Sequence, residues 1–218
     1  MICLFGGTFD PVHAGHLHAA RTVCETLELA RIRLLLSARP GHRDAPGASV
    51  KQRWDMLVLA CADDARLVPD DTEVRRAERL GRPSYAIETL EELRARAPGE
   101  PLTWVVGSDA YRALGEWHRW RELFDLANLV VLRRPGAPLR LDGELARLTA
   151  ERTVAEPPQS PAGGVYMLEA PMLAISATEV RAALAAGGAG AGNVADLLPA
   201  AVYTYIKQYH LYGVVSDA

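Results

Sequence analysis

"GGTFDPVHAGH", residues 6–16, carries the strongest structural signal in the chain and directly follows a short apolar run, "ICLF" at residues 2–5. An apolar run that stops at a pair of glycines is typical of a buried strand that ends in a turn. Apolar residues then recur at spacings of three and four, at Leu17, Ala20, Cys24 and Leu27. That spacing is the stripe of a helix lying on a sheet. The chain is therefore expected to begin as strand, glycine turn and helix.

The same alternation continues downstream. The next apolar runs are "RIRLLL" (31–36), "ARLVP" (65–69), "LTWVVG" (102–107), "NLVVLRRP" (128–135) and "VYMLE" (165–169). Between or after them lie "VKQRWDMLVLACAD" (50–63), "SYAIETLEELRAR" (84–96), "YRALGEWHRWRELF" (111–124) and "SATEVRAAL" (176–184), which are expected to be helical or to begin a helix. Strand and helix in repeated alternation predict an α/β fold, a Rossmann-like doubly wound parallel sheet with helices on both faces.

The length of 218 residues fits a single domain, residues 1–218, with a C-terminal helical region at about 176–213. Residues 135–164 are rich in Pro and Gly and are expected to form a surface excursion with one short helix. "AAGGAGAGN" (185–193) is expected to be a flexible turn. The tail "LPAAVYTYIKQYHLYG" (198–213) has Pro199 at an expected first helical position and apolar or aromatic residues at 202, 205, 206 and 209. It is expected to pack as a closing helix.

Composition narrows the class of protein. Hydrophobic residues make up 49% and charged residues 23% of the chain, with a formal net charge of −3, so nothing favours a nucleic-acid or membrane-surface partner. The cysteines at 3, 24 and 61 are too few and too scattered for a zinc site or a disulfide framework. No run approaches the length of a membrane span. A cytoplasmic protein without a metal site of its own is expected, and its oligomeric state stays open.

The first turn has the properties of a phosphate site. Ligands of an open parallel sheet bind beyond the carboxyl ends of the strands. Gly6 and Gly7 allow a sharp turn and leave no side chain between backbone N–H groups and a ligand. The helix expected near His16 follows Ala14 and Gly15, so no capping side chain occupies its first amides, which are then available to an anion.

Two common phosphate motifs are absent. The turn lacks the third glycine of G-x-G-x-x-G, and a P-loop lysine is ruled out because the lysines are at 51 and 207 only. These observations disfavour a standard dehydrogenase or P-loop enzyme. Taken alone, His13 and His16 could also be two surface or capping histidines.

Two separated motifs carry a family resemblance. "GGTFDPVHAGH" resembles the signature of the nucleotidyltransferase superfamily with its T/H-x-G-H element, here residues 13–16, and "ISATEVR" (175–181) resembles the I-S-x-T-x-x-R element of the same superfamily. Further segments are similar to those of the bacterial nicotinate-nucleotide adenylyltransferases: "RPSYAIETL" (82–90), "VVGSDAYRALGEW" (105–117), "VVLRRPG" (130–136) and the tail. The resemblance extends from residue 2 to about residue 213.

This resemblance implies transfer of AMP from ATP to nicotinate mononucleotide, with release of pyrophosphate and formation of nicotinate adenine dinucleotide. It also implies Mg²⁺ as a companion of the ATP phosphates. Two alternatives stay open. One is an adenylyltransferase for another phosphorylated acceptor, such as nicotinamide mononucleotide or phosphopantetheine. The other is a nucleotide-sensing module that has lost the chemistry.

The resemblance also assigns roles to residues. The expected catalytic residues are His13, His16 and Arg181. The expected ATP-binding residues are Gly6, Gly7, Thr8, Phe9, Gly107, Asp109, Arg134, Ile175, Ser176 and Thr178. The expected contacts to the second substrate are His42, Arg43, Tyr85, Ala86 and Trp117, and the chain departs from the family pattern in having Ala86 where Thr is usual.

Structural roles compete with several of these assignments. Ser176 and Glu179 have the spacing of a helix capping box. Asp109 could cap the following helix, and Trp117 could be a core or surface aromatic. Asp10 is the acid beside the first motif, and we expect it to hold the loop rather than to bind metal.

Overall fold

The computed structural model describes residues 1–38, 46–136, 138–186 and 194–214, with no account of the side chain of Ala195. Within these residues seven strands form one sheet: β1 (Ile2–Gly7), β2 (Ile32–Leu36), β3 (Leu67–Asp70), β4 (Leu102–Gly107), β5 (Asn128–Arg133), β6 (Thr153–Val154) and β7 (Val165–Glu169). Their order is β3-β2-β1-β4-β5-β7-β6, and every neighbouring pair is parallel. The predicted parallel sheet is confirmed.

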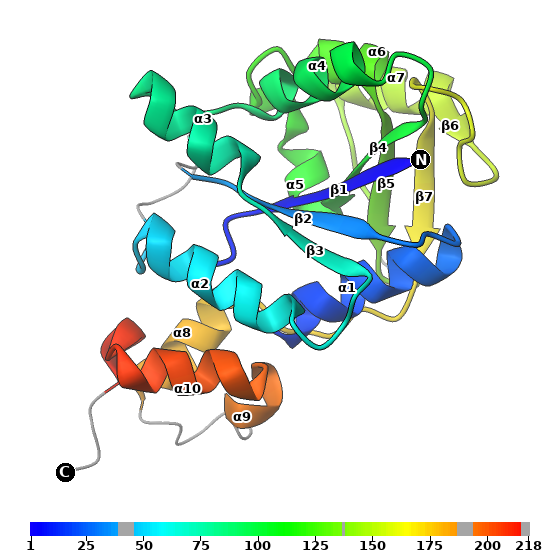
Figure 1. Cartoon of the computed structure of the whole chain (residues 1–218). Helices are drawn as coiled ribbons and strands as arrows, with labels where there is room; N and C mark the ends of the chain where they lie inside the picture. The colour runs from blue at the N-terminus through cyan, green and yellow to red at the C-terminus, as the bar shows by residue number, and fades with distance from the viewer. Residues whose placement is uncertain (39–45, 137, 187–193, 215–218) are drawn as a thin grey trace.

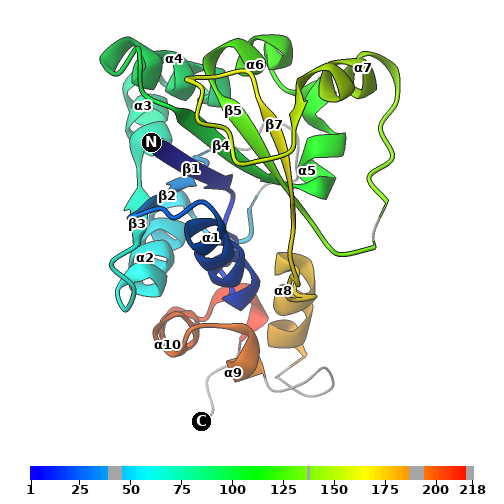
Figure 2. The same ribbon diagram turned by 90° about the vertical axis from the view of Figure 1, so that its right-hand side faces the viewer.

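Helices cover both faces of this sheet (Figures 1 and 2). On one face lie α1 (Ala14–Thr26) and α2 (Val50–Cys61), and on the other α4 (Ala86–Arg96), α5 (Ser108–Arg112), α6 (Leu123–Leu126) and α7 (Gly143–Arg152). Helix α3 (Thr72–Leu80) follows the edge strand β3. The C-terminal helices α8 (Ala177–Ala185), α9 (Val194–Leu197) and α10 (Ala200–Gln208) gather beside α1 and α2.

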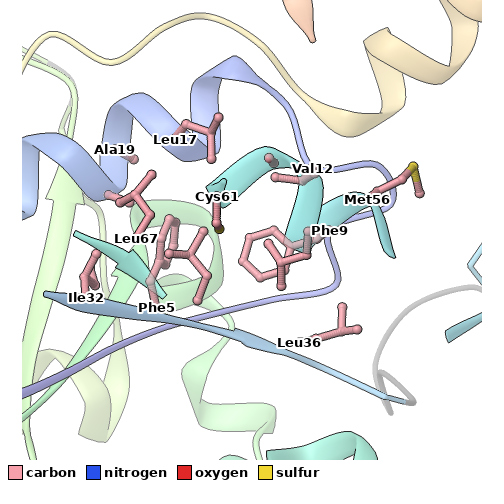
Figure 3. Close-up of a cluster of buried hydrophobic side chains, with 14 of the residues drawn as sticks. Phe5, Phe9, Val12, Leu17, Ala19, Ile32, Leu36, Met56, Cys61 and Leu67 are labelled. Carbon is pink, nitrogen blue, oxygen red and sulfur yellow. The ribbon is translucent and has the colours of Figure 1, made fainter. Parts of the chain in front are cut away.

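Alternation along the strands divides the core into two clusters, because successive side chains of a strand point to opposite faces. Cys3 and Phe5 of β1 join the cluster shared with α1, α2, α8 and α10, whereas Leu4 joins the cluster shared with α4 to α7. Figure 3 shows part of the first cluster, in which Phe5 and Phe9 lie with Leu17 of α1 and Met56 of α2.

Several sequence predictions needed correction. Helix α3 was not predicted, and neither was β6 in the 135–164 excursion, although the single short helix expected there is α7. Residues 111–124 do not form one helix but the end of α5, two 3₁₀ turns (Leu114–Glu116 and Trp120–Glu122) and the start of α6. Pro199 is the N-cap of α10 rather than its first residue. Most of the predicted flexible turn, residues 187–193, lies outside the described residues.

The strand order places a switch point between β1 and β4. From β1 the chain moves outward through β2 and β3, and from β4 it moves the other way through β5 and β7. Such a reversal leaves a crevice at the carboxyl ends of the two central strands. Strand β1 ends at Gly7 and β4 at Gly107, so the 6–16 motif and the start of "GSD" emerge side by side.

Among the described residues no helix has the length and apolar composition needed to cross a membrane.

Candidate active site

The two glycines of the first motif serve packing rather than the turn. Both belong to strand β1, and the sharp turn comes later, at Phe9 with a φ of 47° and at the cis Asp10–Pro11 bond. A Cβ added at Gly6 would lie 2.7 Å from Cζ2 of Trp104, and one at Gly7 would lie 2.8 Å from the ring of Phe9. Any side chain at either position would therefore collide with a buried aromatic ring. Our interpretation of these glycines as the turn itself was wrong.

The two histidines form a stacked pair at the start of α1. The helix begins at Ala14, earlier than the sequence predicted, with His13 as its N-cap. The two imidazole centroids are 3.7 Å apart, and the backbone N–H of His13 donates to Nδ1 of His16 at 3.3 Å. The His16 ring also meets the edge of Phe9, with centroids 5.0 Å apart. Packing thus holds both imidazoles in one place at the helix N-terminus.

His13 is a neutral group with unused hydrogen-bonding capacity. Its side chain is buried, at 4% exposure, and its Nδ1 has no hydrogen-bond partner within the part of the chain that the structure describes. Burial lowers its pKa to about 4, and the nearby Glu179 opposes that shift. At neutral pH His13 therefore offers a ligand a hydrogen bond rather than a positive charge.

Asp10 holds the loop, as predicted. Its buried carboxylate accepts hydrogen bonds from the backbone N–H of Gly47 at 2.7 Å, the backbone N–H of Ala48 at 3.1 Å and the hydroxyl of Tyr212 at 2.8 Å. These bonds connect the turn after β1 to the start of α2 and to the end of the chain. The carboxylate is thereby committed to the protein itself.

Arg53 is a second support for the loop, and the sequence analysis missed it. It is 1% exposed and donates to the backbone carbonyls of Thr8 at 2.8 Å, Ser37 at 2.8 Å, Ala38 at 2.9 Å and Ala48 at 3.3 Å. The guanidinium therefore joins the segments that follow β1 and β2 to the start of α2. One arginine in an arginine-rich chain gave no signal of this role.

The predicted capping box at the start of α8 is present. Ser176 is the N-cap, its Oγ accepts from the backbone N–H of Glu179 at 3.2 Å, and the Glu179 carboxylate accepts from the backbone N–H of Ser176 at 2.9 Å. Ser176 and Thr178 are exposed. The capping alternative is therefore correct for Ser176. The side chain of Thr178 takes no part in the cap and is exposed.

The first and last motifs meet in space. Nη1 of Arg181 donates to the backbone carbonyl of Asp10 at 2.7 Å across a sequence separation of 171 residues, and its Nη2 donates to Oγ1 of Thr178 at 3.4 Å. A Cβ at Gly15 would lie 3.4 Å from the carbonyl oxygen of Ile175. Strands β1 and β7 are not neighbours, so it is the segment after β7 that returns to the first loop.

The segments 82–90 and 105–117 also lie together. Tyr85 is the N-cap of α4, and its ring centroid is 4.5 Å from that of His118. Trp117 is half-buried and packs edge-on against Trp104, with centroids 6.4 Å apart. Ala86 is the first residue of α4. The predicted second-substrate residues Tyr85, Ala86 and Trp117 therefore share one side of the switch point.

Asp109 and Arg134 are exposed, and they follow the carboxyl ends of β4 and β5. The N-cap of α5 is Gly107 rather than Asp109, so the capping alternative for Asp109 is wrong. The Asp109 side chain is 90% exposed and forms an ion pair with Arg112. Arg134 follows β5, and its charge helps to lower the pKa of Glu179, which is set mainly by the hydrogen bonds of Ser176.

His42 and Arg43, two further predicted substrate contacts, lie outside the described residues. Over residues 1–38, 46–136, 138–186 and 194–214, no group of three or more His, Cys, Asp or Glu side chains is arranged to hold a metal ion. The arginines and imidazoles of this region, together with the amides at the N-terminus of α1, are of the types that bind phosphate.

A doubly wound sheet with phosphate-binding groups at its switch point defines a nucleotide-binding α/β protein. Comparison with family models identifies the class more closely, because the cytidylyltransferase-like family model matches residues 4–183. The chain belongs to this family.

Curated relatives give the particular branch. A protein of Stenotrophomonas maltophilia, named "Probable nicotinate-nucleotide adenylyltransferase", is 46% identical over 215 residues, covering 95% of both chains. Proteins with the same name from Pseudomonas aeruginosa and Methylococcus capsulatus are each 43% identical, and cover 97% and 98% of this chain and 96% and 100% of their own. Within its family the chain is thus similar to relatives of this name.

Solved structures agree on the fold. The nicotinic acid mononucleotide adenylyltransferase of Plasmodium falciparum, in a structure complexed with NaAD, superposes with a TM-score of 0.74 at 16% identity and covers 98% of each chain. A putative nicotinate-nucleotide adenylyltransferase from Vibrio parahaemolyticus gives a TM-score of 0.59 at 16% identity, covering 98% of this chain and 96% of its own.

Proposed function

We propose that this protein transfers the AMP group of ATP to nicotinate mononucleotide, forming nicotinate adenine dinucleotide and pyrophosphate. The observation that carries the proposal is the meeting of the first and last motifs, in which Arg181 donates to the carbonyl of Asp10 beside the stacked histidines. The relatives named for this activity, 41–46% identical over nearly the whole chain, support the same reaction.

The chemistry requires positioning more than proton transfer. A phosphate oxygen of the acceptor attacks the α-phosphorus of ATP, a new P–O bond forms, and the bond to the pyrophosphate leaving group breaks. A phosphate monoester has a second pKa near 6, so the attacking oxygen is already largely ionised at neutral pH and needs no general base. The protein must align two anions and balance the charge of the transferring phosphoryl group.

On the ATP side, His16 stabilises the α-phosphoryl oxygens, and His13 supplies a neutral hydrogen-bonding imidazole to the same phosphates. Arg181 binds the β- and γ-phosphates with the N–H groups that Asp10 and Thr178 do not use, together with Thr178 itself. The position of both imidazoles at the N-terminus of α1 supports these roles. Backbone groups at residues 6–9 and 175–176 complete the ATP site.

On the nucleoside side, Asp109 accepts hydrogen bonds from the ribose hydroxyls, and its exposed carboxylate at the end of β4 supports that role. Trp117 stacks on the pyridine ring, with Tyr85 and Ala86 beside it. Arg134 contacts the nucleotide from the end of β5. His42 and Arg43 bind the acceptor phosphate.

The same proposal covers the metal ion, the domain organisation and the cellular location. Mg²⁺ accompanies ATP and is held by phosphate oxygens and water, because the carboxylate of Asp10 is committed to the loop. When bound, the ion neutralises part of the phosphate charge. The chain works as one domain, since its strands and its C-terminal helices share a single hydrophobic cluster, and it works in the cytoplasm.

A pyrophosphate-release assay over three acceptors tests the proposal: nicotinate mononucleotide, nicotinamide mononucleotide and phosphopantetheine. We expect turnover that is fastest with the first and lost in His16→Ala. Faster turnover with either of the other acceptors would move the protein to another transferase of the family. ATP binding without pyrophosphate release from any acceptor would instead identify a nucleotide-sensing module.

A further inference from the structure

The end of the chain returns to the loop that carries the histidines. After α10 comes a short 3₁₀ turn, Leu211–Gly213, which packs beside α8. The ring of Tyr212 lies on Gly47, where an added Cβ would be 3.2 Å from Cδ1 and Cε1 of the ring. Its hydroxyl donates to Oδ1 of Asp10 at 2.8 Å. The tail therefore reaches a residue of the first motif directly.

The backbone of the tail adopts a conformation that needs support. His210 has a φ of 49° and Tyr212 a φ of 57°, both in the left-handed region that residues with a Cβ disfavour. Tertiary contacts must hold such residues in place. The contacts of Tyr212 that provide this support are the ones to Gly47 and Asp10.

Asp10 connects the tail to Arg181. Its Oδ1 accepts from Tyr212 and from the backbone N–H of Ala48, while its backbone carbonyl accepts from Nη1 of Arg181. Burial and the adjoining Asp10 charge raise the pKa of Tyr212, so the phenol stays protonated and remains a donor at neutral pH. The hydroxyl therefore helps to fix the same residue whose carbonyl orients the Arg181 guanidinium.

We infer that Tyr212 is a positioning residue for nucleotidyl transfer, acting through Asp10 to orient Arg181 and the 13–16 turn toward the ATP phosphates. The inference rests on the proposed function, which it extends to the end of the chain. Tyr212 reaches Arg181 through Asp10, so its main effect falls on ATP, and its contact with Gly47, close in sequence to His42 and Arg43, leaves a smaller effect on the acceptor.

Tyr212→Phe tests this role, because it keeps the ring on Gly47 and removes only the hydroxyl. We expect kcat/KM for ATP to fall about tenfold or more, since small displacements of aligned groups cost rate steeply, while KM for the acceptor changes less than KM for ATP. Tyr209→Phe is the matched control. Tyr209 lies on the same terminal segment, its ring packs on Tyr205, and it is 49% exposed, so its variant keeps wild-type kinetics.

Hydrogen exchange of the ligand-free protein gives a second readout that does not depend on turnover. Tyr212→Phe should accelerate exchange at the amides of residues 8–17 and 46–50, and Tyr209→Phe should not. If the wild-type protein releases no pyrophosphate with any acceptor, the proposed function is wrong. Hydrogen exchange then still shows whether the Tyr212 hydroxyl orders the first loop. Wild-type ATP kinetics in Tyr212→Phe, or unchanged exchange in those amides, would overturn the inference.

Discussion

Replacing Arg53 by methionine removes the guanidinium that ties three segments together while leaving an unbranched chain to fill most of the space. The side chain is 1% exposed and makes four hydrogen bonds to backbone carbonyls. The bonds to Ala38 and Ala48 are buried and those to Thr8 and Ser37 are partly buried, so the variant leaves two buried acceptors without donors. A buried acceptor without a donor costs more free energy of folding than the loss of an exposed hydrogen bond, which water can replace.

The magnitude follows from these contacts. Bonds from a charged donor contribute about 1.5 kcal/mol each at the low end, so the four contacts of Arg53 amount to about 6 kcal/mol. Values of this kind already include the cost of desolvating the donor, and burial does lower the pKa of Arg53. Because water can replace the donor at the two partly buried carbonyls, the two buried bonds set the expected loss, which is about 3 kcal/mol of unfolding free energy.

Urea unfolding followed by circular dichroism measures this loss. Arg21→Met is the matched control, because Arg21 pairs with Asp64 while its side chain is 41% exposed, and an exposed pair contributes about 1 kcal/mol or less. We expect a clear separation of the two variants at equal m-values. If Arg53→Met lost no more stability than Arg21→Met, the carbonyl contacts would not support the loop as argued.

Three further outcomes are expected from the same kind of unfolding measurement. Gly7→Ala should lose about 1–3 kcal/mol, because the new Cβ lies 2.8 Å from the buried Phe9 ring, and a neutral variant would contradict that contact. His13 has its pKa lowered to about 4 from 6.5, so the unfolded chain takes up the proton first and the contribution of His13 to the free energy of unfolding should fall by about 2.5 kcal/mol between pH 7 and pH 4.5. His13→Gln should lack that part of the fall. If the free energy of unfolding changed with pH equally in the variant and the wild type, His13 would not have the lowered pKa. Burial raises the pKa of Glu73 to about 8 from 4.5, with Arg76 opposing, so the unfolded chain loses the proton first and the contribution of Glu73 to the free energy of unfolding should fall by about 3 kcal/mol from pH 4.5 to pH 7, opposite in direction to that of His13. Glu73→Gln should lack this fall. If the variant and the wild type showed the same dependence of unfolding free energy on pH, Glu73 would not be a buried neutral carboxyl.

Sequence reasoning was most accurate where a short apolar run alone determines an element. Strand β4 coincides with "LTWVVG", residues 102–107, because a mostly apolar run of this length is typical of a parallel strand buried on both faces. The parallel sheet follows from the alternation of such runs with helical segments, whereas the strand order that creates the switch point is seen only in the structure. The positions of the two superfamily motifs at the carboxyl ends followed in turn from the sheet.

The sequence did not predict a helix whose buried face is half polar. Helix α3 has a buried face that includes Glu73 and Arg76 beside Val74 and Ala77, so its apolar stripe is too narrow for periodicity to detect. Arg76 is bonded to Ser84 and Thr89, contacts that only the folded chain creates. Periodicity also failed at residues 111–124, where the turns interrupt the helical spacing.

The supports of the site were equally hidden. Arg53 and Tyr212 contact the first loop across 45 and 202 residues of chain, and neither position differs in the sequence from an ordinary helix arginine or tail tyrosine. The glycines at 6 and 7 were noticed for the wrong reason, since the rings that require them come from residues 104 and 9. Composition and spacing cannot report which side chains meet after folding.

The most direct test of the whole account is a crystal structure of the protein with bound ATP. The account predicts that phosphate oxygens lie within hydrogen-bonding distance of both the 13–16 turn and the guanidinium of Arg181. A triphosphate that contacts only one of these two groups, or that binds away from the ends of β1 and β4, would contradict it.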